Sequence, residues 1–217
     1  MGDVDIIKIA ASILALAIAV IGHEYMHGWV AYRYGDPTAK LAGRLSLNPI
    51  RHVDPVGTIL IPSILYITGA PFLFGWAKPV PIDMQRVMAG GGYGAAIAVS
   101  LAGITYNLIL AVLLATFLPL FYPPQSILSA LMYLFIAQSV MINVVLAVFN
   151  LWPIPPLDGS QALRYGAMAM GWNGFVRRYE AIYPYGMIIL ITILFIPQIT
   201  SLFFAPVNWI LRLIIPS

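Results

Sequence analysis

The sequence predicts an all-α polytopic membrane protein with about four to six transmembrane helices, since a spanning helix takes about 20 apolar residues. Of the 217 residues, 61% are hydrophobic and only 9% are charged. Soluble proteins have about 45–50% apolar and about 25% charged residues. So few charges cannot cover a surface that faces water, and a soluble globule is therefore excluded. We expect one transmembrane domain over residues 1–217.

The first predicted helix begins at Ile6 and ends before residues 35–37, whose Gly-Asp-Pro sequence stops helices. Its second half carries a polar cluster, so the first membrane segment is expected to hold chemistry. Residues 36–55 are polar and predict an irregular or short-stranded excursion.

An apolar segment follows at residues 56–74. It is interrupted by three helix-breaking residues: Pro62, Gly69 and Pro71. Residues 75–81, Gly-Trp-Ala-Lys-Pro-Val-Pro, are expected to be extended because each proline keeps its predecessor out of the helical region. Broken segments are tolerated at membrane depth where they are buried in protein or line a cavity. We therefore predict a re-entrant or broken segment near residues 56–84.

Two long apolar helices are predicted after a flexible glycine-rich stretch at residues 89–94. They run from about Ala95 to Leu118 and from about Ile127 to Asn150. A proline-rich break then leads into another helix that begins at Asp158. The last stretch, residues 185–215, is apolar. Two prolines are expected to break it: Pro197 and Pro206.

The strongest motif lies on the first helix, where residues 23–27 read His-Glu-Tyr-Met-His. Positions i and i+4 share one helix face, so His23 and His27 can converge on one metal ion, and Glu24 beside them can reach a water there. The alternative is hydrogen-bonded packing of polar side chains. Ionisable groups inside a spanning helix are costly and mark function, which favours a zinc site.

Catalytic zinc usually has three protein ligands and one open position. The chain has no cysteine, so the third ligand must be a histidine or a carboxylate. Asp158 is favoured because it follows a long apolar helix in a proline-rich break, and Gly159 lets the backbone approach closely. His52 and Asp54 remain the alternative, since an H-x-D pair in a loop can bind a metal or hold a metal-bound imidazole.

Three segments resemble the site-2 protease family of intramembrane zinc metalloproteases. They are HEYMH at residues 23–27, SLAGITYN at residues 100–107 and NLWPIPPLDG at residues 150–159. The segments NPIRHVDPVGT and GWAKPVPID resemble the compact subgroup without PDZ or CBS domains. This chain has Ile104 where the family often has proline in A-G-P-x-x-N.

The resemblance implies a role for each matching residue. His23, His27 and Asp158 would bind one zinc ion. Glu24 would be the catalytic base, and Asn150 would orient the substrate or stabilise the oxyanion. All five belong to motifs that this sequence retains.

Weaker candidates lie outside these motifs. Arg44, Asn48 and Lys78 could line a polar path that admits water and substrate. Asn107 could contact the substrate, but for Asn107 and Asn143 hydrogen bonding between helices is the favoured interpretation.

For the three predicted ligands to meet, the first helix must end on the side of the membrane from which Asp158 is reached. Residues 56–74 must then leave and return on that same side. That side would hold nine of the 11 basic residues: Arg33, Lys40, Arg44, Arg51, Lys78, Arg86, Arg164, Arg177 and Arg178. The opposite turn, residues 119–125, has none. By the positive-inside rule the ligand side is cytoplasmic.

The sequence thus predicts a zinc-dependent endopeptidase in a prokaryotic cell (inner) membrane. Its substrates would be membrane proteins with a transmembrane helix, and nucleic acid is not an expected partner. The alternative is a metal-ion transporter or channel that uses the His/Asp cluster as a binding site. The two hypotheses differ at Glu24, because hydrolysis needs a carboxylate that is not a ligand.

Overall fold

The computed structural model describes residues 3–68 and 75–215. Four helical stretches are long and apolar enough to cross a membrane: Ile7–Arg33, Met84–Phe121, Ile127–Leu151 and Asn173–Phe195. Every described element is helical, and the described residues form no strand. The predicted all-α polytopic membrane fold is confirmed, whereas the short strands considered for residues 36–55 do not form.

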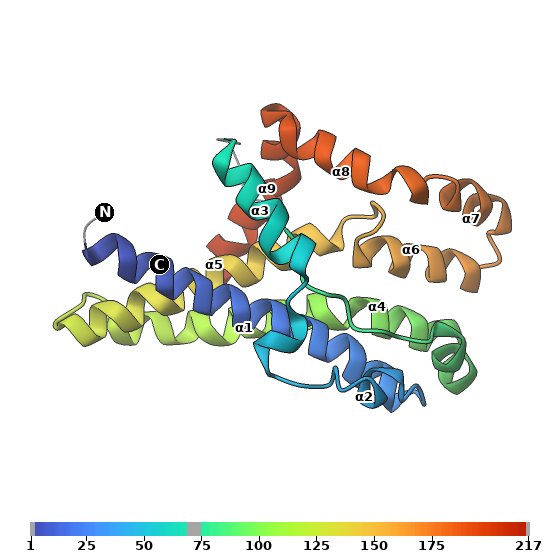
Figure 1. Cartoon of the computed structure of the whole chain (residues 1–217), viewed down its shortest axis with the longest axis horizontal. Helices are drawn as coiled ribbons and strands as arrows, with labels where there is room; N and C mark the ends of the chain where they lie inside the picture. The colour runs from blue at the N-terminus through green and yellow to red at the C-terminus, as the bar shows by residue number, and fades with distance from the viewer. Residues whose placement is uncertain (1–2, 69–74, 216–217) are drawn as a thin grey trace.

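Three helices make the core of the molecule and lie side by side (Figure 1): α1 (Asp3–Arg33), α4 (Met84–Phe117) and α5 (Ile127–Leu151). Small residues on their facing sides, among them Ala19, Ala111 and Ala115, are completely buried, so the backbones approach closely. On the outer face of α1, Ile13 and Leu14 are 63% and 54% exposed. Such an exposed apolar face is suited to lipid.

Helix α4 begins eleven residues earlier than the expected Ala95, at Met84. The Asp83 carboxylate caps this start by accepting hydrogen bonds from the backbone N–H groups of Gln85 and Arg86. The glycine-rich stretch is helical apart from a kink at Gly91 and Gly92, where Gly92 has φ +64°. Glycine tolerates this backbone conformation, so the run bends the helix and does not prevent it.

Between α1 and α4 the chain makes an excursion, residues 36–83. It contains α2 (Thr38–Leu41), the 3₁₀ helix η1 (Pro49–His52), the π-helical turn η2 (Pro55–Leu60) and α3 (Ile61–Ile67). Residues 75–83 are extended, as predicted. The expected breaks at Gly69 and Pro71 lie outside the described residues.

Pro62 does not break the helix, contrary to the expectation. It lies at the start of α3, directly after the π-helical turn η2. Proline lacks an N–H and its ring clashes with the preceding turn, and a wider turn relieves both problems.

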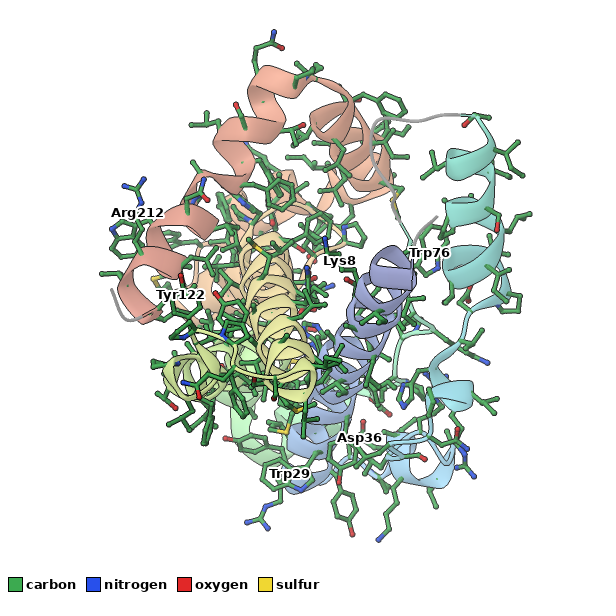
Figure 2. The ribbon with its side chains drawn as sticks, turned by 90° about the vertical axis from the view of Figure 1, so that its left-hand side faces the viewer. Lys8, Trp29, Asp36, Trp76, Tyr122 and Arg212 are labelled. Atoms are coloured by element: carbon green, nitrogen blue, oxygen red, sulfur yellow. The ribbon has the colours of Figure 1, made fainter. Side chains whose placement is uncertain are left out.

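The two ends of the excursion are joined by one buried carboxylate. Asp36, which has no exposed surface, accepts hydrogen bonds from the backbone N–H of Thr38 at 3.0 Å and from that of Asp83 at 2.7 Å. The excursion therefore returns to the point from which it left, as the parity argument requires. Figure 2 shows α3 on the side of α1 that faces away from α5.

The C-terminal part turns back along the bundle. It comprises the helices α6 (Asp158–Ala169), α7 (Asn173–Glu180), α8 (Gly186–Phe195) and α9 (Pro197–Ile214), with the 3₁₀ turn η4 (Tyr183–Tyr185) between α7 and α8. A second 3₁₀ turn, η3 (Leu118–Phe121), follows α4. Pro197 begins α9 as expected, but Pro206 lies inside it. Packing on both sides holds α9 through this proline, because Phe203 packs on Leu190 of α8 and Val207 packs on α5.

Candidate metal centre

Two helices far apart in the sequence bring three ligand groups together. His23 Nε2 lies 3.0 Å from Asp158 Oδ2, and His27 Nε2 lies 3.2 Å from the same oxygen. The two Nε2 atoms are 3.1 Å apart. Both imidazoles are buried, and Asp158 is half-buried at the first turn of α6. Among the residues that the structure describes, this trio is the one group of this kind.

Two glycines make room for the trio. A Cβ atom at Gly103 of α4 would lie 2.5 Å from both His23 Nδ1 and His27 Nε2, so any larger residue would push α1 away. A Cβ atom at Gly159 would lie 2.0 Å from the carbonyl oxygen of Leu151. The absence of a side chain there lets α6 start against the end of α5, which aims Asp158 at the histidines.

The outer nitrogen of each imidazole is bonded to an oxygen. His23 Nδ1 lies 2.7 Å from Asn107 Oδ1, and His27 Nδ1 lies 2.7 Å from the carbonyl oxygen of Val99. Oxygen acceptors require each Nδ1 to carry the proton in the neutral ring. Each Nε2 therefore presents its lone pair to the space between the three side chains.

This donor set fits zinc. Two imidazole lone pairs and one carboxylate oxygen converge, and in this tautomer none of the three atoms carries a hydrogen to donate. They therefore repel one another unless a cation lies between them. Ligand atoms of a tetrahedral zinc site, with bonds of about 2.0–2.2 Å, lie roughly 3.3–3.6 Å apart. The observed separations of 3.0–3.2 Å are close to that spacing.

Glu24 follows His23 on α1 but is outside the trio. Its Oε2 atom accepts a hydrogen bond from the backbone N–H of Val80 at 2.9 Å. The side chain is half-buried. The extended segment at residues 75–83 therefore runs past the residue that the sequence predicts to be the base.

Asn150, the predicted oxyanion residue, is half-buried near the end of α5. Its Nδ2 atom donates to the carbonyl oxygen of Leu146 in its own helix at 3.0 Å. The catalytic role of Asn150 stays a prediction.

The weaker candidates have structural partners in the excursion. The buried Arg44 donates from Nη2 to the carbonyl oxygen of Lys78. Asn48 is exposed and caps η1 by accepting from the backbone N–H of Ile50. The side chain of Lys78 is exposed. These contacts shape the excursion around residues 75–83, and a role in substrate binding stays a prediction.

The alternative ligands His52 and Asp54 lie elsewhere. His52 Nε2 is bonded to the carbonyl oxygen of Ser46 at 2.7 Å, and Asp54 caps η2 by accepting from the N–H groups of Val56 and Gly57. The described residues place neither of them in the trio.

Asn107 and Asn143 join three helices, as their favoured interpretation predicted. Asn107 on α4 donates to the carbonyl oxygen of Ala19 on α1 and to Asn143 on α5. What the sequence did not predict is that Asn107 also contacts His23. The sequence analysis also did not predict the roles of Gly103 and of the Val99 carbonyl. Both contact α1 from α4, and the residues next to them in the sequence carry no pattern that indicates this contact.

Curated proteins that resemble this chain share one description. It is 39% identical over 155 residues to "Putative zinc metalloprotease YwhC" of Bacillus subtilis, a match that covers 70% of this chain and 66% of YwhC. Proteins named Rip2, with the same description, also match. The one from Mycolicibacterium smegmatis is 31% identical over 95% of this chain and 73% of its own. One from Mycobacterium tuberculosis is 28% identical over 88% of this chain and 69% of its own.

The match to YwhC thus spans slightly less than two thirds of the length of that relative. No family model and no solved structure matches this chain.

Proposed function

Since this chain belongs to the site-2 protease family of zinc metalloproteases, we propose that it is a zinc-dependent endopeptidase that cleaves peptide bonds in or near the transmembrane segments of membrane proteins. One observation carries the proposal. Three acceptor atoms, from His23, His27 and Asp158, converge between membrane-spanning helices, next to a carboxylate that is not part of the group. A hydrolytic zinc site needs these four groups.

Each residue has a distinct task. The two imidazoles and Asp158 hold the zinc ion, which when bound would polarise the scissile carbonyl and make water more acidic. Glu24 accepts the proton of the attacking water on its carboxylate and passes it to the leaving amine. The N–H of Val80 orients that carboxylate. Asn150 would turn its amide from Leu146 to the substrate carbonyl.

The excursion is where the substrate enters in this proposal. A transmembrane helix hides its carbonyl groups in its own hydrogen bonds, so it must unwind before it can be cleaved. Residues 75–83, which include Lys78, are extended beside Glu24, and Arg44 donates to the carbonyl oxygen of Lys78. Together with Asn48, these polar residues would provide a hydrated path to the site. The excursion begins and ends at the same end of the bundle as the C-terminus of α1 (Figure 1).

We assign that end to the cytoplasm of a prokaryotic cell (inner) membrane. The elements there carry Arg33, Lys40, Arg86, Arg177 and Arg178, whereas residues 122–126 at the opposite turn carry no basic residue. Positive charge favours the cytoplasmic side. The proposed site therefore opens towards the cytoplasm.

Purified protein incubated with candidate single-span membrane proteins tests the proposal. Cleavage should stop when a chelator removes zinc and return when zinc is restored. Elemental analysis should find about one zinc ion per chain, because the described residues supply one three-ligand set. Wild-type protein that binds no zinc would overturn the assignment.

Glu24→Gln separates the peptidase from a metal transporter. The amide keeps the shape of the side chain but cannot accept the proton, so zinc should stay bound while cleavage falls at least about 10²-fold. Asp54→Asn is a matched control, since it also changes an acid to its amide but leaves the Oδ1 cap of η2 in place. Undiminished cleavage by Glu24→Gln, or zinc transport by it, would contradict the peptidase mechanism.

A further inference from the structure

The outer nitrogens of the two histidines are held by different kinds of acceptor. His27 faces the backbone carbonyl of Val99, which can only accept. His23 faces the side-chain amide of Asn107, whose other end is a donor. The tautomer of the neutral His23 ring therefore depends on which end of the amide is turned towards it.

The neighbours of Asn107 determine which end that is. Its Nδ2 atom lies 3.2 Å from the carbonyl oxygen of Ala19 and 2.8 Å from Asn143 Oδ1. Asn143 is oriented in turn, because its Nδ2 atom donates to the carbonyl oxygen of Ser139 at 2.8 Å. Two backbone carbonyls thus fix the direction of the whole chain of hydrogen bonds. They leave Asn107 Oδ1 to accept from His23.

Burial makes this arrangement rigid. Asn107 and Asn143 have no exposed surface, and they lie on α4 and α5 where both helices pack against α1. A hydrogen bond in such surroundings is stronger than in water, and an unmade one cannot be replaced by solvent. Asn107 is bonded within the protein on both ends of its amide, and its role in binding substrate stays a prediction.

We propose that Asn107, oriented by Asn143, is the positioning residue that keeps the proton of His23 on Nδ1 and thereby aims the Nε2 lone pair at the zinc ion. The proposal rests on the zinc site of the proposed function. Without Asn107 the imidazole can carry its proton on Nε2, which blocks the metal, and the ring is free to turn. Outer partners of this type usually change metal affinity by about 10–100-fold.

Asn107→Leu tests the proposal in the full-length protein, because leucine has a similar size and no acceptor. Zinc affinity, measured by competition with a chelator, should fall by about 10–100-fold. Nitrogen-15 NMR of the imidazoles should show that metal-free His23 no longer keeps its proton on Nδ1, while His27 is unchanged. Ser100→Ala is the matched control: Ser100 is buried on the same helix, and its hydroxyl donates to the carbonyl oxygen of Ala96 one turn earlier, so both readouts should match the wild type.

Asn143→Leu is the second variant, and it keeps both Asn107 and His23. It removes one of the two acceptors that orient Asn107, so zinc affinity should fall less than in Asn107→Leu, and a mixture of His23 tautomers should appear. Wild-type zinc affinity together with an unchanged His23 tautomer in Asn107→Leu would overturn the proposal. If Asn107→Leu does not fold, the same result in Asn143→Leu would overturn it. Failure of the wild type to bind zinc would instead count against the proposed function.

Discussion

Gly103 is the residue whose small size lets α1 and α4 meet at the metal centre. Its missing Cβ atom would lie within 2.5 Å of atoms in both imidazoles. Ordinary contacts between carbon atoms are about 3.5–4.0 Å, so a methyl group here overlaps both rings and at least one of them must move. The geometry of the three ligands depends on this position as directly as on the ligands themselves.

We expect Gly103→Ala to lose zinc while the protein stays helical. The added methyl group must displace His23 or His27, so their Nε2 atoms cannot both keep their positions near Asp158. Zinc affinity should fall at least about tenfold, on the scale of other changes that misplace a metal ligand. Chelator competition measures it, and circular dichroism checks the helix content.

Gly94→Ala is the matched control, because a Cβ atom at Gly94 on the same helix has no neighbour within 4 Å. Alanine is favoured over glycine in a helix by up to about 1 kcal/mol, so this variant should be as stable as the wild type or more stable. If Gly103→Ala bound zinc as Gly94→Ala does, the close approach of α1 and α4 would not be what forms the site.

Which residues of the site could be predicted depends on sequence separation. His23 and His27 are four residues apart on one helix, so local geometry predicted that they share a face. Asp158 needed the resemblance and its place after a helix, since it is 131 residues from His27. The partners on the outer nitrogens are 84 and 72 residues away, and their contacts depend on the register between helices, which no local pattern reports.

At the level of elements, the two ends of the excursion depend on one side chain. Asp36 joins its two ends through the N–H groups of Thr38 and Asp83. It also accepts from the Thr38 hydroxyl. Residues 75–83, which carry the N–H that orients Glu24, are anchored at one end by this carboxylate.

Asp36→Asn should therefore loosen the excursion. Its two oxygens accept from different N–H groups, so an amide must turn a donor towards one of them. A buried N–H left unpaired costs about 1–3 kcal/mol. Hydrogen exchange should become faster at the amides of Thr38 or Asp83 and at Val80, and protease cleavage in the excursion should become faster as well.

The control is again Asp54→Asn, in which one oxygen serves both capped N–H groups and an amide can replace it. Equal exchange rates in the two variants would contradict the anchoring role of Asp36. The proteolytic activity of Asp36→Asn should fall because the Val80 N–H no longer holds Glu24 in place, whereas zinc should stay bound.

Long apolar runs predicted the three core helices well because each is longer than the membrane is thick. The helix predictions that failed concern glycine and proline. The glycines before Ala95 lie within α4 because Asp83 caps an earlier start, and Pro206 lies within α9 because packing on α5 and α8 holds both of its sides. In both cases tertiary contacts outweigh a local preference against helix.

On the scale of the whole molecule, charge and parity support the same proposed orientation. Helix α1 ends and α4 begins at one end of the bundle, and the turn between α4 and α5 lies at the other (Figure 1). Since the ends of the excursion meet at Asp36, residues 36–83 add no net crossing. Every later crossing then follows in order, and Arg33, Lys40, Arg86, Arg177 and Arg178 lie on the elements at the end where α1 stops, whereas Lys8 lies near the start of α1.

Cysteine labelling tests this orientation, because the chain has no cysteine of its own. Single cysteines replace Lys40 and Lys78 on the two arms of the excursion and Gln125 in the opposite turn, all of them exposed positions. With a membrane-impermeant thiol reagent, we expect Gln125→Cys to react in intact cells, since residues 122–126 lack the positive charge that holds a loop in the cytoplasm. Lys40→Cys and Lys78→Cys should react only after the membrane is opened. Reaction of these two from opposite sides would mean that the segment between them crosses the membrane, and the metal centre could not then be assembled from α1 and α6 as the structure has it.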